Sequence, residues 1–458
     1  MEALIIAAGR GSRLNHRHSP KPLTRMMGLN LLERIILTAK NAGVEGFKIV
    51  VGYKAEAIKQ ALGNGEKYGT TIEYIYNPEW QKGNGVSVLA AKDYFHEPFI
   101  LLMADHLFEE SIIRDLLNFP IEDGECVLAI DRNLKGSHFS LDDVTKVLVD
   151  DGYISKIGKT VHQYNALDTG FFLCTPVLFQ ALEHSVANGD YGLSGGNQIL
   201  ASMGSLRTLD ITGRLWIDVD DEVAYKKAKR TLVRSLLKQT DGPISKRLNR
   251  KISSRVSSFL SERSVTPNHM TWVSFVVAAL AAACFYKASY AWILLGGVLA
   301  QLSSILDGCD GEIARLKFQH SFFGMWLDRI LDRYADGLII IGMTYALWLR
   351  LQSPLAWLVG GLALLGTFLN SYTAVAYDKL VKRGLVAGNN HMRIGRDVRL
   401  FVVFLGAVLN QLMTTLLVLV ALTHFESIRR LLLLRHVTTD ARVAGTTTVR
   451  DYLPLPGA

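Results

Sequence analysis

Four aspartates lie at helical spacings within residues 305–332, between two apolar runs. Asp307 and Asp310 are three residues apart, and Asp328 and Asp332 are four residues apart. On a helix, each spacing places both carboxylates on one face, so two antiparallel helices joined by a short turn would bring all four together. Unpaired carboxylates in or near lipid are costly. We therefore expect this cluster to bind divalent cations, Mg²⁺ or Mn²⁺.

Small residues accompany these aspartates. Gly311, Ala314 and Gly324 leave room for close helix packing, or for a flat ligand against the backbone. The spacing alone also fits an ion or proton pathway, or a charged loop between helices. Glu312 belongs to the same stretch but not to the aspartate spacing, and we expect it to have a structural role.

A second group of residues near the N-terminus could bind phosphate. The segment LIIAAGRGSRL runs from an apolar strand into a turn in which Gly9 and Gly11 let the backbone approach an anion. Arg10 and Arg13 add positive charge, and Lys21 follows between two prolines that stiffen its presentation. The GxG pair alone also fits an ordinary tight turn.

The elements that position these residues differ between the two halves of the chain. Up to residue 235, short β-rich runs such as ALIIAAG, FKIVVGY and FILLMAD alternate with helical patterns at 31–43 and 54–65. Such alternation predicts βαβ units. We therefore expect residues 1–235 to form an α/β, Rossmann-like domain with a mostly parallel sheet covered on both faces.

Long apolar runs dominate from about residue 270, which predicts an all-α polytopic membrane domain at 269–435 and a tail at 436–458. The predicted transmembrane helices lie near 270–286, 290–306, 322–349, 354–378, 397–409 and 411–428. The last two could form one helix, because a bilayer core needs only about 20 apolar residues. Basic residues after the second and fourth spans and at the C-terminal flank favour six, with both termini and the first domain in the cytoplasm.

Residues 236–268 are predicted to form a linker that contains a basic amphipathic helix. Its apolar positions are Ile244, Leu248, Ile252, Val256 and Phe259. Because basic residues lie between them, this helix fits either an anionic membrane surface or ordinary packing.

Charge and cysteine content narrow the class of protein. The net charge is +8, and the positive residues concentrate at 226–263 and in the short loops of the second half. This distribution indicates a membrane-adjacent chain and argues against nucleic acid as a partner. The four cysteines lack CxxC spacing, so we expect reduced, mostly buried thiols. The N-terminus lacks a signal-peptide pattern, which again places the first domain in the cytoplasm.

The first half resembles the sugar-nucleotidyltransferases over about residues 1–230. The resemblance rests on AAGxGxRL followed by PKPL, and then on KGNGVSVLAA, LLMADHLF and WIDVDDEVAY in the same order. It implies that a phosphate oxygen attacks the α-phosphorus of a nucleoside triphosphate. Asp105, with Asp218 or Asp220, would hold Mg²⁺, while Lys21 and Arg13 would hold the phosphates.

The same resemblance assigns two further groups of residues. The family reads the nucleotide base in the segment that holds Lys82, Asn84 and Ser87, and it holds an acceptor sugar or polyol near Asp168 and Lys159. The sequence GNGVSV departs from the GTAxA pattern of uridylyl and thymidylyl transfer and is closer to cytidylyltransferases. CTP is therefore the expected nucleotide.

The second half resembles the CDP-alcohol phosphotransferases over about residues 240–430, including TPNHMT before the first span, with every signature position filled. The resemblance implies that Asp307, Asp310 and Asp328 bind metals that bridge the pyrophosphate of a CDP-alcohol. Asp332 would share this metal site and act as the general base, with CMP as the leaving group. The other signature positions, expected at the nucleotide, are Gly311, Ala314, Arg315 and Gly324.

Two arginines near the predicted fifth span are candidates for the acceptor site. Arg396 and Arg399 are three residues apart at the cytoplasmic end of this span. They would bind a phosphate on the acceptor, or they would serve only as positive-inside anchors.

The fusion of both halves resembles the bifunctional inositol-1-phosphate cytidylyltransferase and di-myo-inositol-phosphate-phosphate synthases. The resemblance implies that CTP and inositol 1-phosphate give CDP-inositol, which then reacts with a second inositol 1-phosphate. It also implies a homodimer through the membrane helices. Two other functions fit the sequence: a phospholipid synthase with a lipid alcohol as acceptor, and a metal or solute transporter with a nucleotide-sensing domain.

Overall fold

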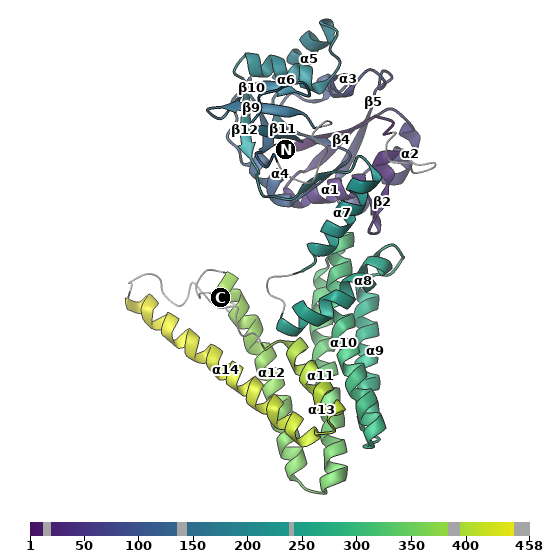
Figure 1. Cartoon of the computed structure of the whole chain (residues 1–458), viewed down its shortest axis with the longest axis vertical. Helices are drawn as coiled ribbons and strands as arrows, with labels where there is room; N and C mark the ends of the chain where they lie inside the picture. Colours follow the sequence, from purple (N-terminus) through teal and green to yellow (C-terminus); the bar gives the residue numbers. More distant parts are fainter. Residues whose placement is uncertain (12–19, 135–143, 238–241, 383–393, 444–458) are drawn as a thin grey trace, which may run out of the picture. The chain divides into compact units, whose positions relative to one another are not determined.

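The computed structural model describes residues 1–11, 20–134, 144–237, 242–382 and 394–443 (Figure 1). The chain divides into two compact units, Met1–Leu232 and Val233–Ala458. We call them the α/β unit and the helical unit.

A nine-stranded mixed sheet forms the centre of the α/β unit, in the order β5-β4-β1-β6-β11-β8-β12-β10-β9. Its strands are β1 (Glu2–Ala7), β4 (Gly46–Val51), β5 (Thr71–Tyr76), β6 (Phe99–Met103), β8 (Cys126–Asp131), β9 (Lys146–Asp150), β10 (Tyr153–Gly158), β11 (Ala166–Cys174) and β12 (Leu206–Asp210). Two short pairs accompany the sheet: β2 (Arg25–Met26) with β3 (Leu29–Asn30), and β7 (His106–Phe108) with β13 (Trp216–Asp218).

The expectation of a mostly parallel sheet is wrong, because four strand pairings are parallel and five are antiparallel. β5, β4, β1 and β6 run parallel, as helical crossovers require. β11, however, is antiparallel to both β6 and β8, and β9 is antiparallel to β10. The β9–β10 turn consists of Asp151 and Gly152, with φ values of 47° and 84°. A two-residue turn of this kind joins only antiparallel strands.

Helices cover both faces of the sheet, as predicted. One face is covered by α1 (Leu31–Ala42), α2 (Ala55–Leu62) and α4 (Glu110–Leu117), and the other by α3 (Asn84–Leu89), α5 (Val177–Ala187) and α6 (Leu193–Ser202). Side-chain alternation in β1 sends Ala3 and Ile5 into one core and Leu4 into the other. α7 (Glu222–Arg234) follows β13. The four cysteines of the chain are buried and free of disulfides, as expected.

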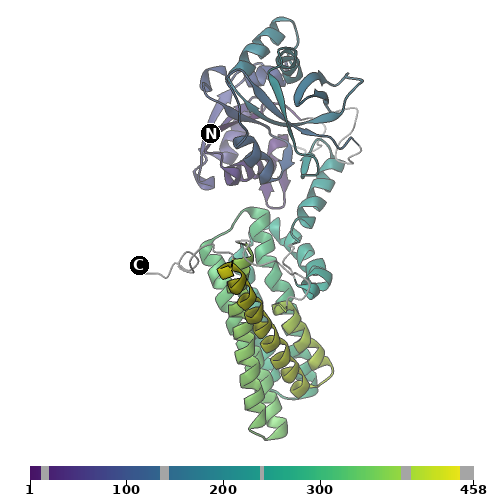
Figure 2. The ribbon, with the colours of Figure 1, turned by 90° about the vertical axis from the view of Figure 1, so that its left-hand side faces the viewer.

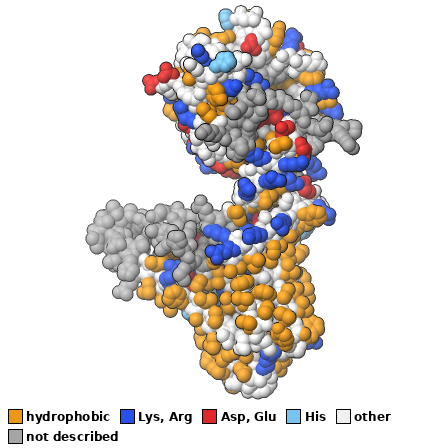
Figure 3. Space-filling view, viewed as in Figure 1, with side chains coloured by type: hydrophobic (Ala, Val, Ile, Leu, Met, Phe, Trp, Pro, Cys, Tyr) orange, Lys and Arg blue, Asp and Glu red, His pale blue; other side chains and the backbone are white. Residues whose placement is uncertain are grey.

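The helical unit contains helices at all six positions where spans were predicted (Figure 2). They are α9 (Pro267–Phe285), α10 (Tyr290–Lys317), α11 (Phe322–Leu351), α12 (Leu355–Lys382), α13 (Arg396–Val408) and α14 (Leu412–Val443). In the described part of the chain, three segments are long and apolar enough to cross a membrane by length and composition: Pro267–Phe285, Tyr290–Lys317 and Leu355–Asp378. Apolar side chains cover the face of this unit seen in Figure 3.

Small residues and helix ends shape this bundle. α9 begins at a capping box between Thr266 and His269. A Cβ on Gly342 of α11 would lie 2.8 Å from the carbonyl oxygen of Ala282 on α9, so glycine permits the close approach of these helices. The last two helices are separate, because the chain turns at Asn410, whose φ is 56°.

The linker helix α8 (Arg250–Ser261) packs against α10 through a polar stripe. Ser253, Ser257 and Ser261 on this stripe are fully buried. Ile252 and Phe259, on the predicted apolar face, remain 43% and 59% exposed. Ile252 and Phe259 are therefore left uncovered by the described residues, whereas Val256 of the same predicted face packs against buried Met270, Cys309 and Ile313.

Candidate active sites

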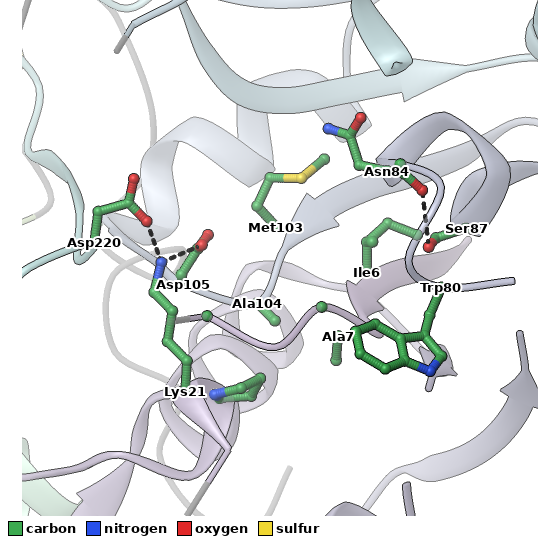
Figure 4. Close-up of a pocket in the computed structure, with 14 residues that line it drawn as sticks. Ile6, Ala7, Lys21, Trp80, Asn84, Ser87, Met103, Ala104, Asp105 and Asp220 are labelled. Carbon is green, nitrogen blue, oxygen red and sulfur yellow. Dashed lines mark hydrogen bonds and ion pairs between the residues drawn. The ribbon is translucent and has the colours of Figure 1, made fainter. Parts of the chain in front are cut away.

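The turn after β1 borders a cavity of about 390 Å³ in the α/β unit (Figure 4). Gly9, Gly11 and Lys21 all line it. Gly11 has a φ of +58°, and a Cβ on it would overlap the Lys21 side chain, so two separate constraints require glycine. Lys21 opens a short 3₁₀ helix, Lys21–Leu23. The predicted glycine turn and lysine therefore meet in one cavity.

Lys21 is ion-paired with two carboxylates at this cavity (Figure 4). Its Nζ lies 2.6 Å from Asp105 Oδ2 and also pairs with Asp220. Burial would lower the pKa of Lys21, but the neighbouring aspartates outweigh it and raise that pKa above its usual range. Burial opposes ionisation of Asp105, yet Lys21 and His106 hold the pKa of its carboxyl well below its usual range. Lys21 and Asp105 therefore stay charged at neutral pH.

His106 belongs to this site, although the sequence interpretation missed it. Its Nδ1 lies 2.7 Å from Asp105 Oδ1 and 4.0 Å from Asp218 Oδ1, and its ring lies parallel to that of Trp216. Burial would lower the pKa of His106, but the two aspartates raise it to about 9. Burial raises the pKa of Asp218 to about 7. Its position directly after Asp105 could have indicated its place in the site, but only carboxylates were considered as ligands.

The donor atoms of this group fit a divalent cation. Asp105, His106 and Asp218 each offer an atom, and these atoms lie within 4.8 Å of one another. Asp218 Oδ1 is buried and has no hydrogen-bond partner among the described residues. Carboxylate oxygens are the preferred ligands of Mg²⁺ and Mn²⁺. The two aspartates could therefore hold such an ion.

The segment predicted to read the base lies only partly in the cavity. Asn84 and Ser87 of α3 line it, and Trp80, which was not predicted, lines it as well (Figure 4). Asn84 Oδ1 accepts a 2.8 Å hydrogen bond from the N–H of Leu193, which fixes the start of α3 against α6. Lys82 does not line the cavity, and its exposed amine forms an ion pair with a surface glutamate.

The residues predicted to hold the acceptor also lie apart from the cavity lining. Asp168 Oδ1, on β11, accepts a 2.8 Å hydrogen bond from the N–H of Gly170. Burial raises the pKa of Asp168 to about 6, against the effects of this hydrogen bond and of the nearby His106. Lys159 is exposed just after β10. Arg13 lies outside the described residues.

A second cavity of about 580 Å³ lies in the helical unit, lined by residues of α9, α10 and α11. The aspartates Asp307, Asp310 and Asp328 line it. Asp332 lies one turn beyond Asp328 on α11, next to Asp307 and Asp328. The predicted nucleotide positions that line the cavity are Gly311, Ala314, Arg315 and Gly324. The structure thus brings the whole signature to one place.

The second aspartate cluster also fits a divalent cation. Asp307, Asp328 and Asp332 each offer an oxygen, and these oxygens lie within 4.8 Å of one another. Asp310 is not one of these three, and Thr271 Oγ1 donates a 2.8 Å hydrogen bond to its Oδ2. This all-oxygen set suits Mg²⁺ or Mn²⁺. Thr271 was not predicted to have a role, although it lies in the TPNHMT segment.

Arg396 lies within this cluster. Its Nη1 is 2.7 Å from Asp332 Oδ1 and 2.9 Å from Asp307 Oδ1, and its Nε donates a 3.0 Å hydrogen bond to Asp336 Oδ1. The Arg396 side chain is 10% exposed. A basic residue that was predicted beside the aspartates is therefore buried among them.

Arg399 makes the neighbouring contacts on α13. Its Nη2 donates hydrogen bonds to Asp336 Oδ2 at 2.8 Å and to Ser371 Oγ of α12 at 3.3 Å. Neither Asp336 nor Ser371 was predicted. Asp336 lies four residues after Asp332, so a second step of the four-residue spacing from Asp328 could have indicated it.

Glu312 lies apart from the cluster of Asp307, Asp328 and Asp332, in keeping with the expected structural role. It is fully buried, and it accepts hydrogen bonds from Arg250 at 2.6 Å, Ser253 at 2.7 Å and Ser257 at 2.6 Å. These partners all lie on α8. Glu312 therefore fastens the linker helix to α10 beside the second cavity.

Family comparisons match each unit separately. The MobA-like NTP transferase domain matches residues 3–186, and the CDP-alcohol phosphatidyltransferase family matches residues 264–425. The chain therefore combines a nucleotidyltransferase domain with a CDP-alcohol phosphotransferase domain.

Similar proteins share this combination over most of their length. A bifunctional IPC transferase and DIPP synthase from Rubrobacter xylanophilus is 35% identical over 437 residues, which cover 94% of this chain and 96% of that protein. A protein of the same name from Thermococcus kodakarensis is 37% identical, over 81% of this chain and 81% of that protein. Another from Aquifex aeolicus is 32% identical, over 93% of this chain and 96% of that protein. The chain belongs to the family of bifunctional IPC transferases and DIPP synthases.

Proposed function

We propose that this chain makes CDP-inositol in its α/β unit and consumes it in its helical unit. In the first reaction, CTP and inositol 1-phosphate give CDP-inositol and pyrophosphate. In the second, CDP-inositol and another inositol 1-phosphate give di-myo-inositol phosphate phosphate and CMP. The observation that carries the proposal is a separate carboxylate cluster beside a separate cavity in each unit.

In the first reaction, an oxygen of the inositol phosphate attacks the α-phosphorus of CTP, and pyrophosphate leaves. Gly9 and Gly11 would place backbone N–H groups against the phosphates. Lys21, already cationic and directed at the cavity, would pair with phosphate charge. Asn84 and Ser87 would contact the base, and Asp168 would accept hydrogen bonds from acceptor hydroxyls.

In the second reaction, a hydroxyl oxygen of the acceptor attacks the phosphorus next to the inositol group of CDP-inositol. Asp332 would take the proton from this hydroxyl. CMP leaves. Arg396 and Arg399 would bind the phosphate that the acceptor already carries. The position of Arg396 supports this role, since its Nη1 lies 2.7 Å from Oδ1 of Asp332, the proposed base.

Divalent cations are proposed for both sites. Mg²⁺ or Mn²⁺ would neutralise the phosphate charges that meet in each reaction. The proposed ligands are Asp105, Asp218 and Asp220 in the α/β unit, and Asp307, Asp310, Asp328 and Asp332 in the helical unit.

We further propose that α9 to α14 cross the cell membrane six times, with both termini and the α/β unit in the cytoplasm. α13 has 13 residues, or about 20 Å of helix, so the bilayer core of about 30 Å would have to thin locally for this helix to cross it. α8 would lie on the membrane surface, with exposed Ile252 and Phe259 in lipid and exposed Lys251 and Arg255 near anionic headgroups. The family resemblance also predicts a homodimer through the membrane helices.

Two variants of the full-length chain test the assignment of the reactions. Asp105→Asn should abolish CDP-inositol formation but leave CMP release from supplied CDP-inositol intact. Asp332→Asn should do the reverse. The products are followed by ³¹P NMR. Loss of both reactions in either folded variant would refute the two-site assignment.

The nature of the acceptor is tested with labelled CDP-inositol. Membranes that contain the protein are incubated with labelled CDP-inositol and inositol 1-phosphate, and the products are extracted with organic solvent. Label in the aqueous phase supports a soluble polyol phosphate as the acceptor. Label in the organic phase would identify a lipid alcohol instead and overturn the proposed second reaction.

A further inference from the structure

A carboxylate outside the aspartate signature joins the two arginines of α13. Asp336 is 3% exposed. Its Oδ1 accepts a 3.0 Å hydrogen bond from Arg396 Nε, and its Oδ2 accepts a 2.8 Å hydrogen bond from Arg399 Nη2. Each oxygen thus binds a different guanidinium, so Asp336 fixes the distance between the two.

Arg396 is shared between Asp336 and the metal-binding carboxylates. Its Nη1 lies between Asp307 and Asp332, at 2.9 and 2.7 Å, while its Nε points to Asp336. A buried guanidinium requires a paired carboxylate. If Asp336 were uncharged, the strongest partners left to Arg396 would be the two aspartates that the cation also needs.

Two guanidiniums on one turn of a helix repel each other unless a negative charge lies between them. Asp336 supplies this charge from α11, through one hydrogen bond to each side chain. Such a pair of planar donors is well suited to a phosphate group.

We propose that Asp336 is a positioning residue for the second reaction. It holds Arg396 and Arg399 side by side for the acceptor phosphate, and it keeps Arg396 from closing on the metal-binding aspartates. This inference rests on the proposed role of the two arginines in binding inositol 1-phosphate.

The test compares Asp336→Asn with Glu426→Gln in the full-length chain. Glu426 of α14 is a matched control, because its carboxylate is 2% exposed and pairs with Arg429 and Arg430 rather than with Arg396 or Arg399. Asp336→Asn should raise the KM for inositol 1-phosphate in CMP release by about 10-fold, the effect expected when one charged hydrogen bond is lost. It should also weaken Mn²⁺ binding to the helical unit, measured by electron paramagnetic resonance. The protein for this measurement also carries Asp105→Asn, which inactivates the α/β unit. Glu426→Gln should change neither quantity.

Several results would overturn the inference. If Asp336→Asn lowers kcat but leaves the KM for inositol 1-phosphate and Mn²⁺ binding unchanged, Asp336 does not position the arginines. The same conclusion follows if Glu426→Gln shifts both quantities equally. Should Asp336→Asn fail to fold, Asp336→Glu keeps the charge but moves it, and the absence of any rise in the KM would count against the proposal. By contrast, wild-type protein that releases no CMP with inositol 1-phosphate would refute the proposed function itself.

Discussion

Replacement of Thr271 by valine removes one hydroxyl and keeps the shape of the side chain. This hydroxyl donates a 2.8 Å hydrogen bond to Asp310 Oδ2, and Thr271 is only 4% exposed, so water cannot readily take its place. A hydrogen bond to a charged group contributes about 1.5–3 kcal/mol. If the orientation of the Asp310 carboxylate loses that much stabilisation, kcat/KM for CMP release falls about 10- to 150-fold.

The assay measures CMP release from CDP-inositol and inositol 1-phosphate, with CDP-inositol formation from CTP as an internal reference. Thr423→Val is the control, because Thr423 is also buried but donates its 2.7 Å hydrogen bond to the Leu419 carbonyl of its own helix. The reference reaction should stay unchanged in both variants. Thr271→Val protein with wild-type CMP release, or with both reactions reduced alike, would refute the reasoning.

Three further predictions concern the α/β unit and the linker helix. Gly11→Ala should lower CDP-inositol formation about 100-fold, the scale of a catalytic group displaced by about 1 Å, because the new methyl group overlaps Lys21. Gly124→Ala, at a similar positive φ of +89° with open space around it, should leave that rate unchanged. Because burial raises the pKa of Asp168 to about 6, its carboxylate is charged above that pH and neutral below it. The KM of the first reaction for inositol 1-phosphate should therefore rise as the pH falls through 6, and Asp168→Asn should remove this dependence. Glu312→Ala should lower the free energy of unfolding of the helical unit by about 3–5 kcal/mol, because the buried Arg250 guanidinium loses its carboxylate partner. Denaturation of the purified protein measures this loss, and an unchanged midpoint would contradict it.

Much of the second site could be predicted because its residues lie on two consecutive helices. α10 ends at Lys317 and α11 begins at Phe322, so a short turn returns the chain and sets the aspartate faces against each other. Local helical spacing was then sufficient to predict that the aspartates of the two helices lie together. Asp336 follows the same spacing, but its contact depends on α13, which is far along the chain. The partner of Asp336, and hence its role, could not be read from local pattern.

The α/β unit shows the same boundary between local and long-range information. The glycine turn and Lys21 are adjacent in sequence, and the strand before them predicts where they lie. The insertion of β11 between β6 and β8 depends on pairing between distant segments, so periodicity did not reveal the antiparallel pairings of β11. His106 was missed for a chemical reason, since the family pattern directed attention to carboxylates alone.

Each active site contains its own basic side chain against the carboxylates: Lys21 in one unit and Arg396 in the other. These internal counter-ions give both sites partial charge balance before any metal arrives, so the chain should fold and enter the membrane without one. A cation that binds later must displace or share these contacts, which weakens its hold on the free enzyme. We therefore expect Mg²⁺ to bind and dissociate together with each nucleotide. The rate of turnover should then depend on the concentration of the magnesium–nucleotide complex.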